Sequence, residues 1–245
     1  MAKSGIRPAG LLVDTIFSSD GVFADPTGFL RGAVEAIRAA GGLFIADEVQ
    51  PGFGRCGAGM WGFGRHNTVP DLVAMGKPMG NGHPIAAMAA RPEHLATFGA
   101  RSRYFNTFGG NPVSAAAGLA VLDVIENESL IGNAQRTGAY LIERLRRLQA
   151  QHALIAEVRG AGLFIGVELR HGGMQGTPAR QESADIVNLL RARHVLISSA
   201  GPYGNVLKIR PPLVFATEHA DLLAESLDQA LQAIQKAGSP AGTAS

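Results

Sequence analysis

Two short apolar runs in this chain each stop at a single charged residue, and they constrain the fold more than any other feature. Residues 43–46 (LFIA) run into Asp47, and residues 72–75 (LVAM) run through Gly76 into Lys77. Apolar runs of this length bounded by turn signals are typical of strands buried in a parallel sheet. The carboxyl ends of parallel strands meet at one edge, where the ligands of open α/β sheets bind. We therefore expect Asp47 and Lys77 at the same edge of a sheet.

The rest of the first half alternates between strands and helices. Residues 11–13 form an apolar run that ends at Asp14, and a helix is expected from about Pro26 to the glycines at 41–42. A strand, a helix and a strand in this order make a right-handed βαβ unit with parallel strands. A further strand is expected at 85–89. Asn111-Pro112 should open a long helix, because proline at the first helical position loses no hydrogen bond.

The pattern changes near residue 130, where a second long helix begins. Beyond it, two strands, a helix, two strands and a helix are expected at 155–158, 163–169, 179–193, 195–197, 206–209 and 217–236. This order is typical of a small α+β domain. The sequence therefore predicts an α/β protein with a mostly parallel-sheet domain at 1–130, an α+β domain at 131–236 and a disordered tail at 237–245.

Composition excludes several classes of function. The 245 residues have a formal net charge of +2 with scattered basic residues, which argues against a nucleic-acid partner. The single cysteine excludes an intramolecular disulfide and a multi-cysteine metal site. No apolar run approaches the roughly 20 residues that span a bilayer, and the first residues lack the apolar run of a signal peptide. We expect a cytoplasmic globular protein with no metal and no membrane partner.

Asp47 and Lys77 have the chemistry that an aldehyde cofactor with a ring nitrogen requires. Lys77 stands between an apolar strand and PMGNG at 78–82, a segment too rich in breakers for a helix. A lysine there is expected to be semi-buried, and desolvation lowers a lysine pKa, so that a neutral amine is available for Schiff-base formation. The Asp47 carboxylate would hold a pyridinium proton through a hydrogen bond of about 1.5–3 kcal/mol. The alternatives are a solvated lysine and a carboxylate that caps a turn.

Other segments carry further candidate ligands. Thr107 precedes the helix opened by Asn111-Pro112, so its hydroxyl and free backbone N–H groups make a phosphate seat, while Asn111 can also act as an N-cap. Arg210 follows a strand, where a guanidinium can bind a carboxylate through two hydrogen bonds. GFGRCG at 52–57 matches the dinucleotide pattern G-x-G-x-x-G, but it does not open a helix directly after a strand, so a flexible loop is the better interpretation. We interpret the long loop over 49–70 as functional.

Five segments in order carry a resemblance to a known family: FIADEVQ at 44–50, MGKPMGNGHP at 75–84, FNTFGGNP at 105–112, RGAGLF at 159–164 and KIRPP at 208–212. Together they resemble the class III, pyridoxal-phosphate-dependent aminotransferases of fold type I, over about residues 9–236. The wording is most similar to the branch with ethanolamine-phosphate phospho-lyase and alanine–glyoxylate aminotransferase-like proteins. The resemblance implies a transaminase that moves an amino group from an amine or amino acid to an oxo acid, with pyridoxal 5′-phosphate as cofactor.

The resemblance also implies roles for the residues around the expected strand ends. Lys77 would hold the cofactor as a Schiff base and then move protons. Asp47 would pair with the pyridine nitrogen, Val49 would pack on one face of the ring, and Gln50 would reach the phenolic oxygen.

Two implied roles concern the rest of the site. Thr107 would bind the cofactor phosphate of the neighbouring subunit, so the resemblance implies a homodimer with its site at the subunit interface. Arg210 would hold a substrate carboxylate. Family members that accept two kinds of substrate have a glutamate where this chain has Ser19. This departure argues against a 4-aminobutyrate-type dual-substrate mechanism.

The matched part starts within the cofactor domain of the family, so the pyridoxal-phosphate-binding domain at 1–130 is expected to be incomplete. Family members carry a glycine–serine phosphate loop, a ring-stacking aromatic residue and several strands upstream of the matched part. A fragment, a truncated gene product and one half of a split enzyme all fit this pattern. Two alternative functions stay open: a phospho-lyase that uses the same cofactor on a phosphorylated amino alcohol, and a non-catalytic truncated remnant.

Overall fold

The chain forms two compact units. The computed structural model describes residues 5–238. One unit contains the chain up to Ile16 together with Asp25–Ile131, and the other contains Phe17–Ala24 and the chain from Gly132 onward. The division after Ile131 lies beside the boundary expected near residue 130. In contrast, the segment Phe17–Ala24, which the sequence places in the first domain, belongs to the second unit.

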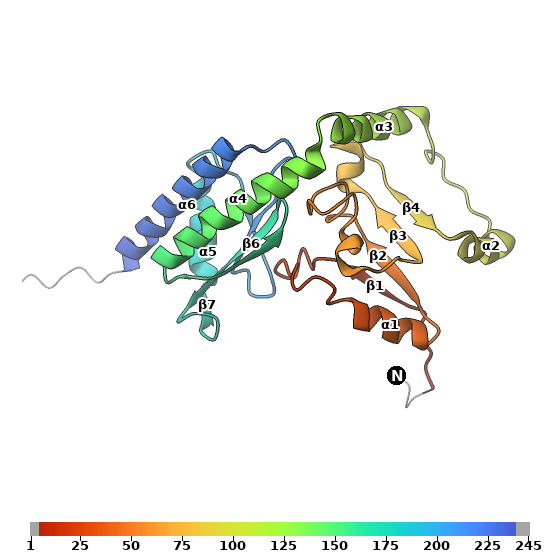
Figure 1. The fold of residues 1–245 in the computed structure, drawn as a ribbon, viewed down its shortest axis with the longest axis horizontal. Helices are drawn as coiled ribbons and strands as arrows, with labels where there is room; N and C mark the ends of the chain where they lie inside the picture. Colours follow the sequence, from red (N-terminus) through yellow and green to blue (C-terminus); the bar gives the residue numbers. More distant parts are fainter. Residues whose placement is uncertain (1–4, 239–245) are drawn as a thin grey trace, which may run out of the picture. The chain divides into compact units, whose positions relative to one another are not determined.

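The first unit is built on a four-stranded sheet (Figure 1). Its strands are β1 (Gly10–Asp14), β2 (Leu43–Asp47), β3 (Leu72–Met75) and β4 (Ala87–Ala90), in that order across the sheet. The pairs β1–β2 and β2–β3 are parallel, and β4 runs antiparallel to β3. The expected βαβ unit with parallel strands is therefore confirmed, and the sheet is mostly parallel.

Helix α1 (Arg31–Ala39) joins β1 to β2 and covers one face of the sheet. Val34 of the helix packs against Phe44 and Ala46 of β2, and all three side chains are buried. The helix begins at Arg31 rather than near Pro26. Gly28 has a φ of +86°, which lies outside the helical region, so the chain makes turns before the helix starts.

The first unit also contains two 3-10 helices, η2 (Gly62–His66) and η3 (Lys77–Gly80), and two longer helices, α2 (Pro92–Arg101) and α3 (Pro112–Asn127). The expectation that no helix follows Lys77 is wrong for one short turn. η3 is only four residues long, and Asn81 ends it with a φ of +45°.

Helix α2 was not predicted, although Pro92 at its start is a helix signal. The strand expected at 85–89 forms at Ala87–Ala90.

The second unit packs helices on an antiparallel sheet (Figure 1). Its elements are α4 (Leu130–Gln151), β5 (Ile155–Ala161), β6 (Phe164–His171), β7 (Thr177–Pro178), α5 (Arg180–Arg191), β8 (Ser198–Ala200), β9 (Val206–Ile209) and α6 (Thr217–Gly238). The sheet order is β5-β6-β9-β8, and β7 pairs with β6. Apolar residues of α4, α5 and α6 form one core with the sheet, as expected for an α+β domain.

Two boundaries in the second unit differ from the expectation. The strand expected at 195–197 forms at Ser198–Ala200, because Val195 and Ile197 pack against the apolar core instead of pairing in the sheet. Helix α6 continues to Gly238, so the expected disorder is wrong for Ala237 and Gly238. Residues 239–245 of that tail lie outside the described residues.

A buried arginine explains why Phe17–Ala24 belongs to the second unit. Arg159 of β5 donates from Nη2 to the carbonyl oxygen of Gly21 at 2.7 Å and from Nε to that of Val22 at 2.9 Å. Its guanidinium also lies 4.4 Å from the ring centre of Phe23. On the other side, Nη1 donates to Glu168 Oε2 at 2.7 Å. One side chain from β5 therefore binds a segment that is far away in sequence.

The ion pair keeps Glu168 ionised. Burial alone would raise the pKa of this carboxyl, but hydrogen bonds and charges from Arg170 and Arg159 outweigh burial and lower it. The buried carboxylate is thereby compensated, as a charge in a core must be.

Two glycines of α4 give a matched test of the packing in the second unit. A Cβ at Gly138 would lie 2.1 Å from the carbonyl oxygen of Gly162, in the turn between β5 and β6, so Gly138→Ala should destabilise the fold by about 1–3 kcal/mol. A Cβ at Gly132 would meet the flexible end of Arg136 at 3.0 Å. Gly132→Ala should therefore be neutral or stabilise by up to about 1 kcal/mol. Denaturant unfolding measures both, and equal losses of stability would contradict the packing described.

Candidate active site

The carboxyl ends of β2 and β3 place Asp47 and Lys77 at one edge of the parallel sheet. Asp47 is the last residue of β2 and lies opposite Ala74 of β3. Met75 and Gly76 then lead to Lys77, the first residue of η3. A carboxylate and an amine therefore follow neighbouring parallel strands at the same edge of the sheet, as the strand pattern predicts.

Val49 connects these two strand ends. Its backbone N–H donates to Asp47 Oδ1 at 3.0 Å, which fixes the turn that follows β2. Its two methyl groups lie 3.9 and 4.0 Å from the position that a Cβ on Gly76 would occupy. The structure therefore brings Asp47, Val49 and the segment before Lys77 together. Gln50, the next candidate, is half-buried in the turn that follows.

Lys77 differs from the expectation in one respect. Its backbone φ of +39° lies in the left-handed region, which for a residue other than glycine is uncommon. Its side chain is exposed, so the expected semi-burial is wrong for the described part of this chain. Lys77 follows Gly76 after the end of β3 and begins η3, and among the described residues none buries its side chain. Strain of this kind occurs often at functional sites.

Glu48 is a buried carboxylate that sequence reasoning missed. Its side chain is fully buried, and it accepts three hydrogen bonds. Oε2 accepts from Gly62 N at 2.7 Å, and Oε1 accepts from Phe63 N at 2.8 Å and from Thr15 Oγ1 at 3.2 Å. The hydrogen-bond donors of Glu48 lie 14 or more residues away in sequence, so they leave no local pattern. The only sequence signal was a second carboxylate directly after Asp47.

Burial decides the protonation of Glu48. Burial raises the pKa of Glu48 from an ordinary value of 4.5 to about 7, and the charge of Asp14 adds to the rise. The hydrogen bonds from Gly62, Phe63 and Thr15 act in the opposite direction but do not outweigh burial. Within the first unit, a carboxyl that titrates near neutral pH therefore lies beside the candidate Asp47.

His66 gives Thr15 a second contact. The imidazole is fully buried, its Nε2 lies 2.7 Å from the carbonyl oxygen of Thr15, and Phe29 packs edge-on at 4.6 Å between ring centres. Burial lowers the pKa of His66, so the ring is neutral and Nε2–H donates to that carbonyl. Thr15 is thus held by its backbone to η2 and by its hydroxyl to Glu48.

The long loop after Val49 is packed, not exposed. Phe53 and Cys56 are buried, and Phe53 meets Trp61 edge-on with 5.3 Å between ring centres. No helix opens at GFGRCG, as the argument against a dinucleotide site expects. The flexible loop expected there is wrong, because the side chains of this segment form part of the interior of the first unit.

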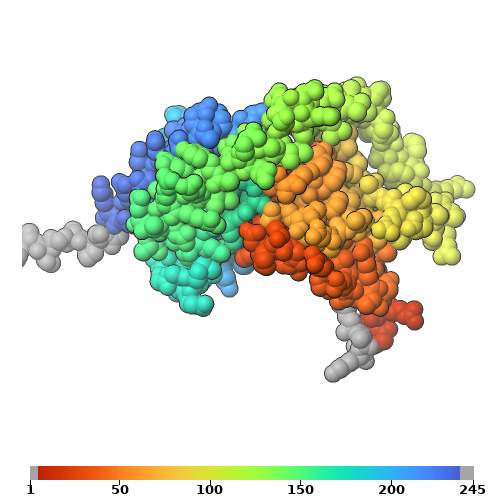
Figure 2. Space-filling view, in the orientation of Figure 1, coloured from red at the N-terminus to blue at the C-terminus, as the bar shows by residue number. Residues whose placement is uncertain are grey.

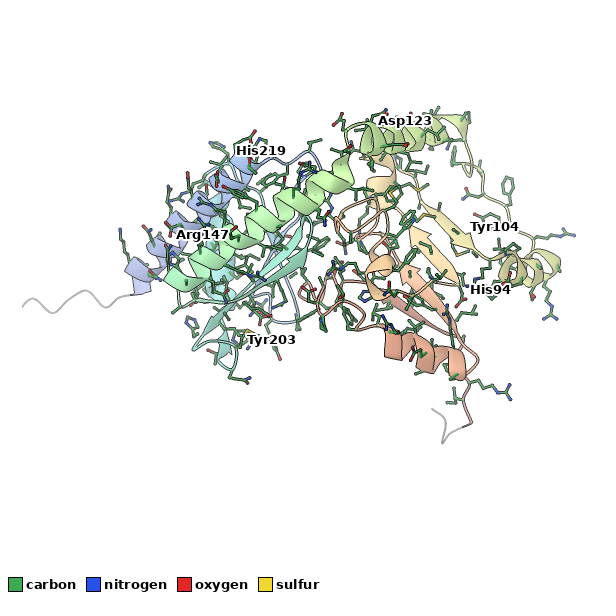
Figure 3. The ribbon with its side chains drawn as sticks, in the orientation of Figure 1. His94, Tyr104, Asp123, Arg147, Tyr203 and His219 are labelled. Carbon is green, nitrogen blue, oxygen red and sulfur yellow. The ribbon has the colours of Figure 1, made fainter. Side chains whose placement is uncertain are left out.

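Thr107 lies on an exposed loop between α2 and α3. Asn111 is the N-cap of α3, and its Oδ1 accepts from Ser114 N at 2.9 Å, so the N-cap interpretation is confirmed. His83 Nε2 lies 2.7 Å from Ser114 Oγ and joins this helix start to the segment after Lys77. Tyr104, labelled in Figure 3, is 72% exposed on the same loop. The Thr107 side chain is exposed, and the helix that follows its loop begins with the Asn111 cap.

Arg210 belongs to the second unit. It directly follows β9, is exposed, and lines a cavity of about 500 Å³. Apolar side chains such as Ile197 and Phe215 form much of the cavity wall, and His219 (labelled in Figure 3) lies at the start of α6 beside it. A guanidinium at the rim of an apolar cavity is suited to hold a small carboxylate while the rest of the molecule contacts apolar wall.

Two further kinds of site are absent from the described part of the chain. Across residues 5–238, the titratable side chains form no group of three or more that could coordinate a metal ion. Within the same residues, every helix is too short or too polar to cross a membrane.

The titration of Glu48 leads to a test by unfolding. Because the folded pKa of about 7 lies above the ordinary 4.5, the folded state holds a proton that the unfolded chain releases. This contribution to the free energy of unfolding is complete below pH 4.5 and is lost as the pH rises through 7. The loss should be on the order of 3 kcal/mol, at about 1.36 kcal/mol per pKa unit.

The measurement is denaturant unfolding between pH 4.5 and 7.5. Glu48→Gln should remove the decline in stability across this range, while the exposed Glu35→Gln should keep it. Parallel pH profiles for the native chain and Glu48→Gln would show that Glu48 does not titrate in this way.

Comparison with known proteins agrees with the geometry. The family described as Aminotransferase class-III matches residues 3–231. The chain is 47% identical to alanine–glyoxylate aminotransferase 2 homolog 2, mitochondrial, of Arabidopsis thaliana, over 91% of this chain and 46% of that protein. It is 38% identical to ethanolamine-phosphate phospho-lyase homolog 1 of Caenorhabditis elegans, over 91% of this chain and 48% of that protein.

A solved structure of a related protein has the same fold. A phospholyase from Arthrobacter in complex with phosphoethanolamine superposes with a TM-score of 0.90 and 45% identity, over 98% of this chain and 56% of that one. The chain spans about half the length of the curated relatives it matches. The family match over most of the chain shows that the chain belongs to the class III aminotransferases.

Proposed function

We propose that the whole protein is a pyridoxal-phosphate-dependent transaminase that moves an amino group from an amine or amino acid to an oxo acid. The observation that carries the proposal is the placement of Asp47 and Lys77 after neighbouring parallel strands, with Val49 packed against the segment between them. Relatives named as alanine–glyoxylate aminotransferases support the transfer of an amino group.

The residues of this chain fit the cofactor. Asp47 is a half-buried acceptor whose Oδ1 accepts from Val49 N, and among the described residues nothing donates to its Oδ2. That oxygen can accept from a ring N–H. Lys77 carries an exposed amine that an aldehyde can reach, and Val49 offers an apolar surface to one face of a ring. Gln50 in the following turn would reach the phenolic oxygen.

Pyridoxal phosphate, when bound, supplies an electron sink that weakens bonds to the α-carbon of an amine. The chain's own residues bind, orient and move protons. Asp47 would accept the hydrogen bond of the ring nitrogen and keep its proton in place. Lys77 would hold the cofactor through its amine and would take and return a proton. Arg210 would hold a substrate carboxylate through its guanidinium.

Thr107 would act in the site of a second subunit, so the proposal includes a homodimer. The loop around Thr107 and the following helix expose large apolar side chains, namely Tyr104, Phe105, Phe108, Val113 and Leu119. The space-filling view shows residues 101–124 at the surface of the molecule (Figure 2). Several large apolar side chains exposed on one loop and the helix that follows it are typical of an interface with another chain. Light scattering of the purified protein measures the oligomeric state.

The proposal keeps the cytoplasmic location and the absence of nucleic-acid and membrane partners as predictions. The name of the Arabidopsis relative says mitochondrial, so cell fractionation is the measurement that separates the two compartments.

Substitution of Lys77 tests the enzyme. Borohydride treatment of the protein with pyridoxal phosphate should attach the cofactor to Lys77, as located by peptide mass mapping. Lys77→Ala should abolish this attachment and lower the rate of amino transfer by at least about 10²–10⁴-fold, because proton transfer is lost. Lys236→Ala on the exposed surface of α6 is the matched control and should change neither. Native protein that takes up no cofactor would favour the non-catalytic alternative.

A phospho-lyase is the second candidate, and the Arthrobacter structure favours it because that protein was solved with phosphoethanolamine. This enzyme would use Lys77 and Asp47 in the same way but eliminate phosphate from a phosphorylated amino alcohol. Incubation with phosphoethanolamine and with alanine separates the candidates. We expect pyridoxamine phosphate to accumulate with alanine as donor. Release of inorganic phosphate with no pyridoxamine phosphate would instead establish the lyase.

A further inference from the structure

The carboxyl ends of β1 and β2 share a local pattern. Asp14 and Asp47 are register partners in the parallel pair. Asp14 Oδ1 accepts from Ile16 N at 3.0 Å, just as Asp47 Oδ1 accepts from the N–H two residues further on. The two residues that follow, Thr15 and Glu48, then hydrogen-bond to each other at 3.2 Å. A side-chain bond therefore joins the two turns directly beyond the end of the sheet.

Glu48 extends this connection in two more directions. Its backbone N–H donates to the carbonyl oxygen of Ala74 on β3 at 2.9 Å, which continues the β2–β3 pairing by one residue. Its backbone carbonyl accepts from Gly52 N at 3.1 Å. Its carboxyl binds Gly62 and Phe63 of η2. Glu48 is therefore hydrogen-bonded to the residue after β1, to β3, to Gly52 near the start of the loop and to η2 further along it.

The loop is folded so closely on Glu48 that two of its positions accept glycine alone. A Cβ at Gly62 would lie 2.4 Å from Thr15 Oγ1 and 2.7 Å from Pro51 Cβ. A Cβ at Gly52 would lie 2.7 Å from the carbonyl oxygen of Glu48. The contact at Gly52 is with a backbone atom, and the Pro51 atom beside Gly62 belongs to a rigid ring, so a side-chain rotation relieves neither contact. The path of the loop is therefore fixed by the contacts of Glu48 and Thr15.

Glu48 lies between Asp47 and Val49 in sequence, and its side chain is fully buried while both neighbours are half-buried. We propose that Glu48 is a positioning residue of the cofactor site: its buried carboxyl fixes the segment 47–49, so that the Asp47 carboxylate and the Val49 side chain meet the cofactor ring in one orientation. This inference rests on the proposed function, because the ring is the group that the segment would meet. Glu48 itself touches neither cofactor nor substrate in this assignment.

Amide hydrogen exchange tests the proposal without any cofactor. Glu48→Gln keeps the size of the side chain but turns an amide NH₂ toward backbone N–H donors. The amides of Gly62 and Phe63 should lose protection, by about tenfold or more, since each loses a hydrogen bond to a carboxylate. The decisive amide is Val49 N–H, which binds Asp47 and not Glu48. It should also lose protection by about tenfold if Glu48 positions the segment.

A matched pair at Thr15 covers the case in which Glu48→Gln does not fold. Thr15→Val removes the hydroxyl that donates to Glu48, and Thr15→Ser keeps it. Thr15→Val should lower the protection of the Val49 amide, and Thr15→Ser should keep it at the native level. Unchanged protection of the Val49 amide in both Glu48→Gln and Thr15→Val, with loss at Gly62 and Phe63 only, would overturn the proposal. Glu48 would then hold the loop and nothing else.

The dissociation constant for pyridoxal phosphate, measured by the absorbance of the bound cofactor, is the second readout. Glu48→Gln should raise this constant by about tenfold, and Thr15→Ser should leave it near the native value. Native affinity in Glu48→Gln would count against positioning. If the native protein binds no pyridoxal phosphate, the proposed function fails, while the exchange of the Val49 amide still decides whether Glu48 orients Asp47.

Discussion

The burial of the Glu48 carboxyl is the interaction on which the first unit depends. A carboxyl group removed from water must be hydrogen-bonded, and here its partners come from the turn after β1 and from η2. Because these partners are far apart in sequence, the sheet edge and the long loop must form together. Asp47 and Val49 lie on either side of this residue in sequence, which is why we propose that Glu48 orients the candidate site.

The sequence was sufficient for the strands of the first unit and for the edge at which Asp47 and Lys77 lie. These features are local, since a short apolar run bounded by turn residues already identifies a buried strand. The hydrogen bonds of Glu48 could not be predicted, because two of its three donors are backbone N–H groups whose identity leaves no trace in the sequence. The exposure of Lys77 was missed for a related reason: a charged residue after a buried strand can turn outward within one residue, as its φ of +39° shows.

In the second unit, too, local patterns could be predicted and long-range contacts could not. Its core could be anticipated from apolar periodicity, and helices α5 and α6 formed close to the expected ranges. That Phe17–Ala24 belongs to this unit could not be predicted. It depends on hydrogen bonds from Arg159, which is more than 130 residues away in sequence. Val22 adopts a φ of +62° there, which a β-branched residue tolerates only where its surroundings fix it. Long-range contacts of single buried side chains, rather than patterns, decide such placements.

The homodimer that we propose would account for both the exposure of Lys77 and the exposed apolar side chains around Thr107. A lysine that attaches an aldehyde needs a neutral amine, and removal of water from its surroundings favours that form. The described residues leave Lys77 exposed. Large apolar side chains of α3 and of the loop before it are exposed too, although apolar side chains of a helix normally face a core. A neighbouring surface that covers both would bury the amine and the apolar face at once. Cofactor attachment and association with that surface should therefore be coupled.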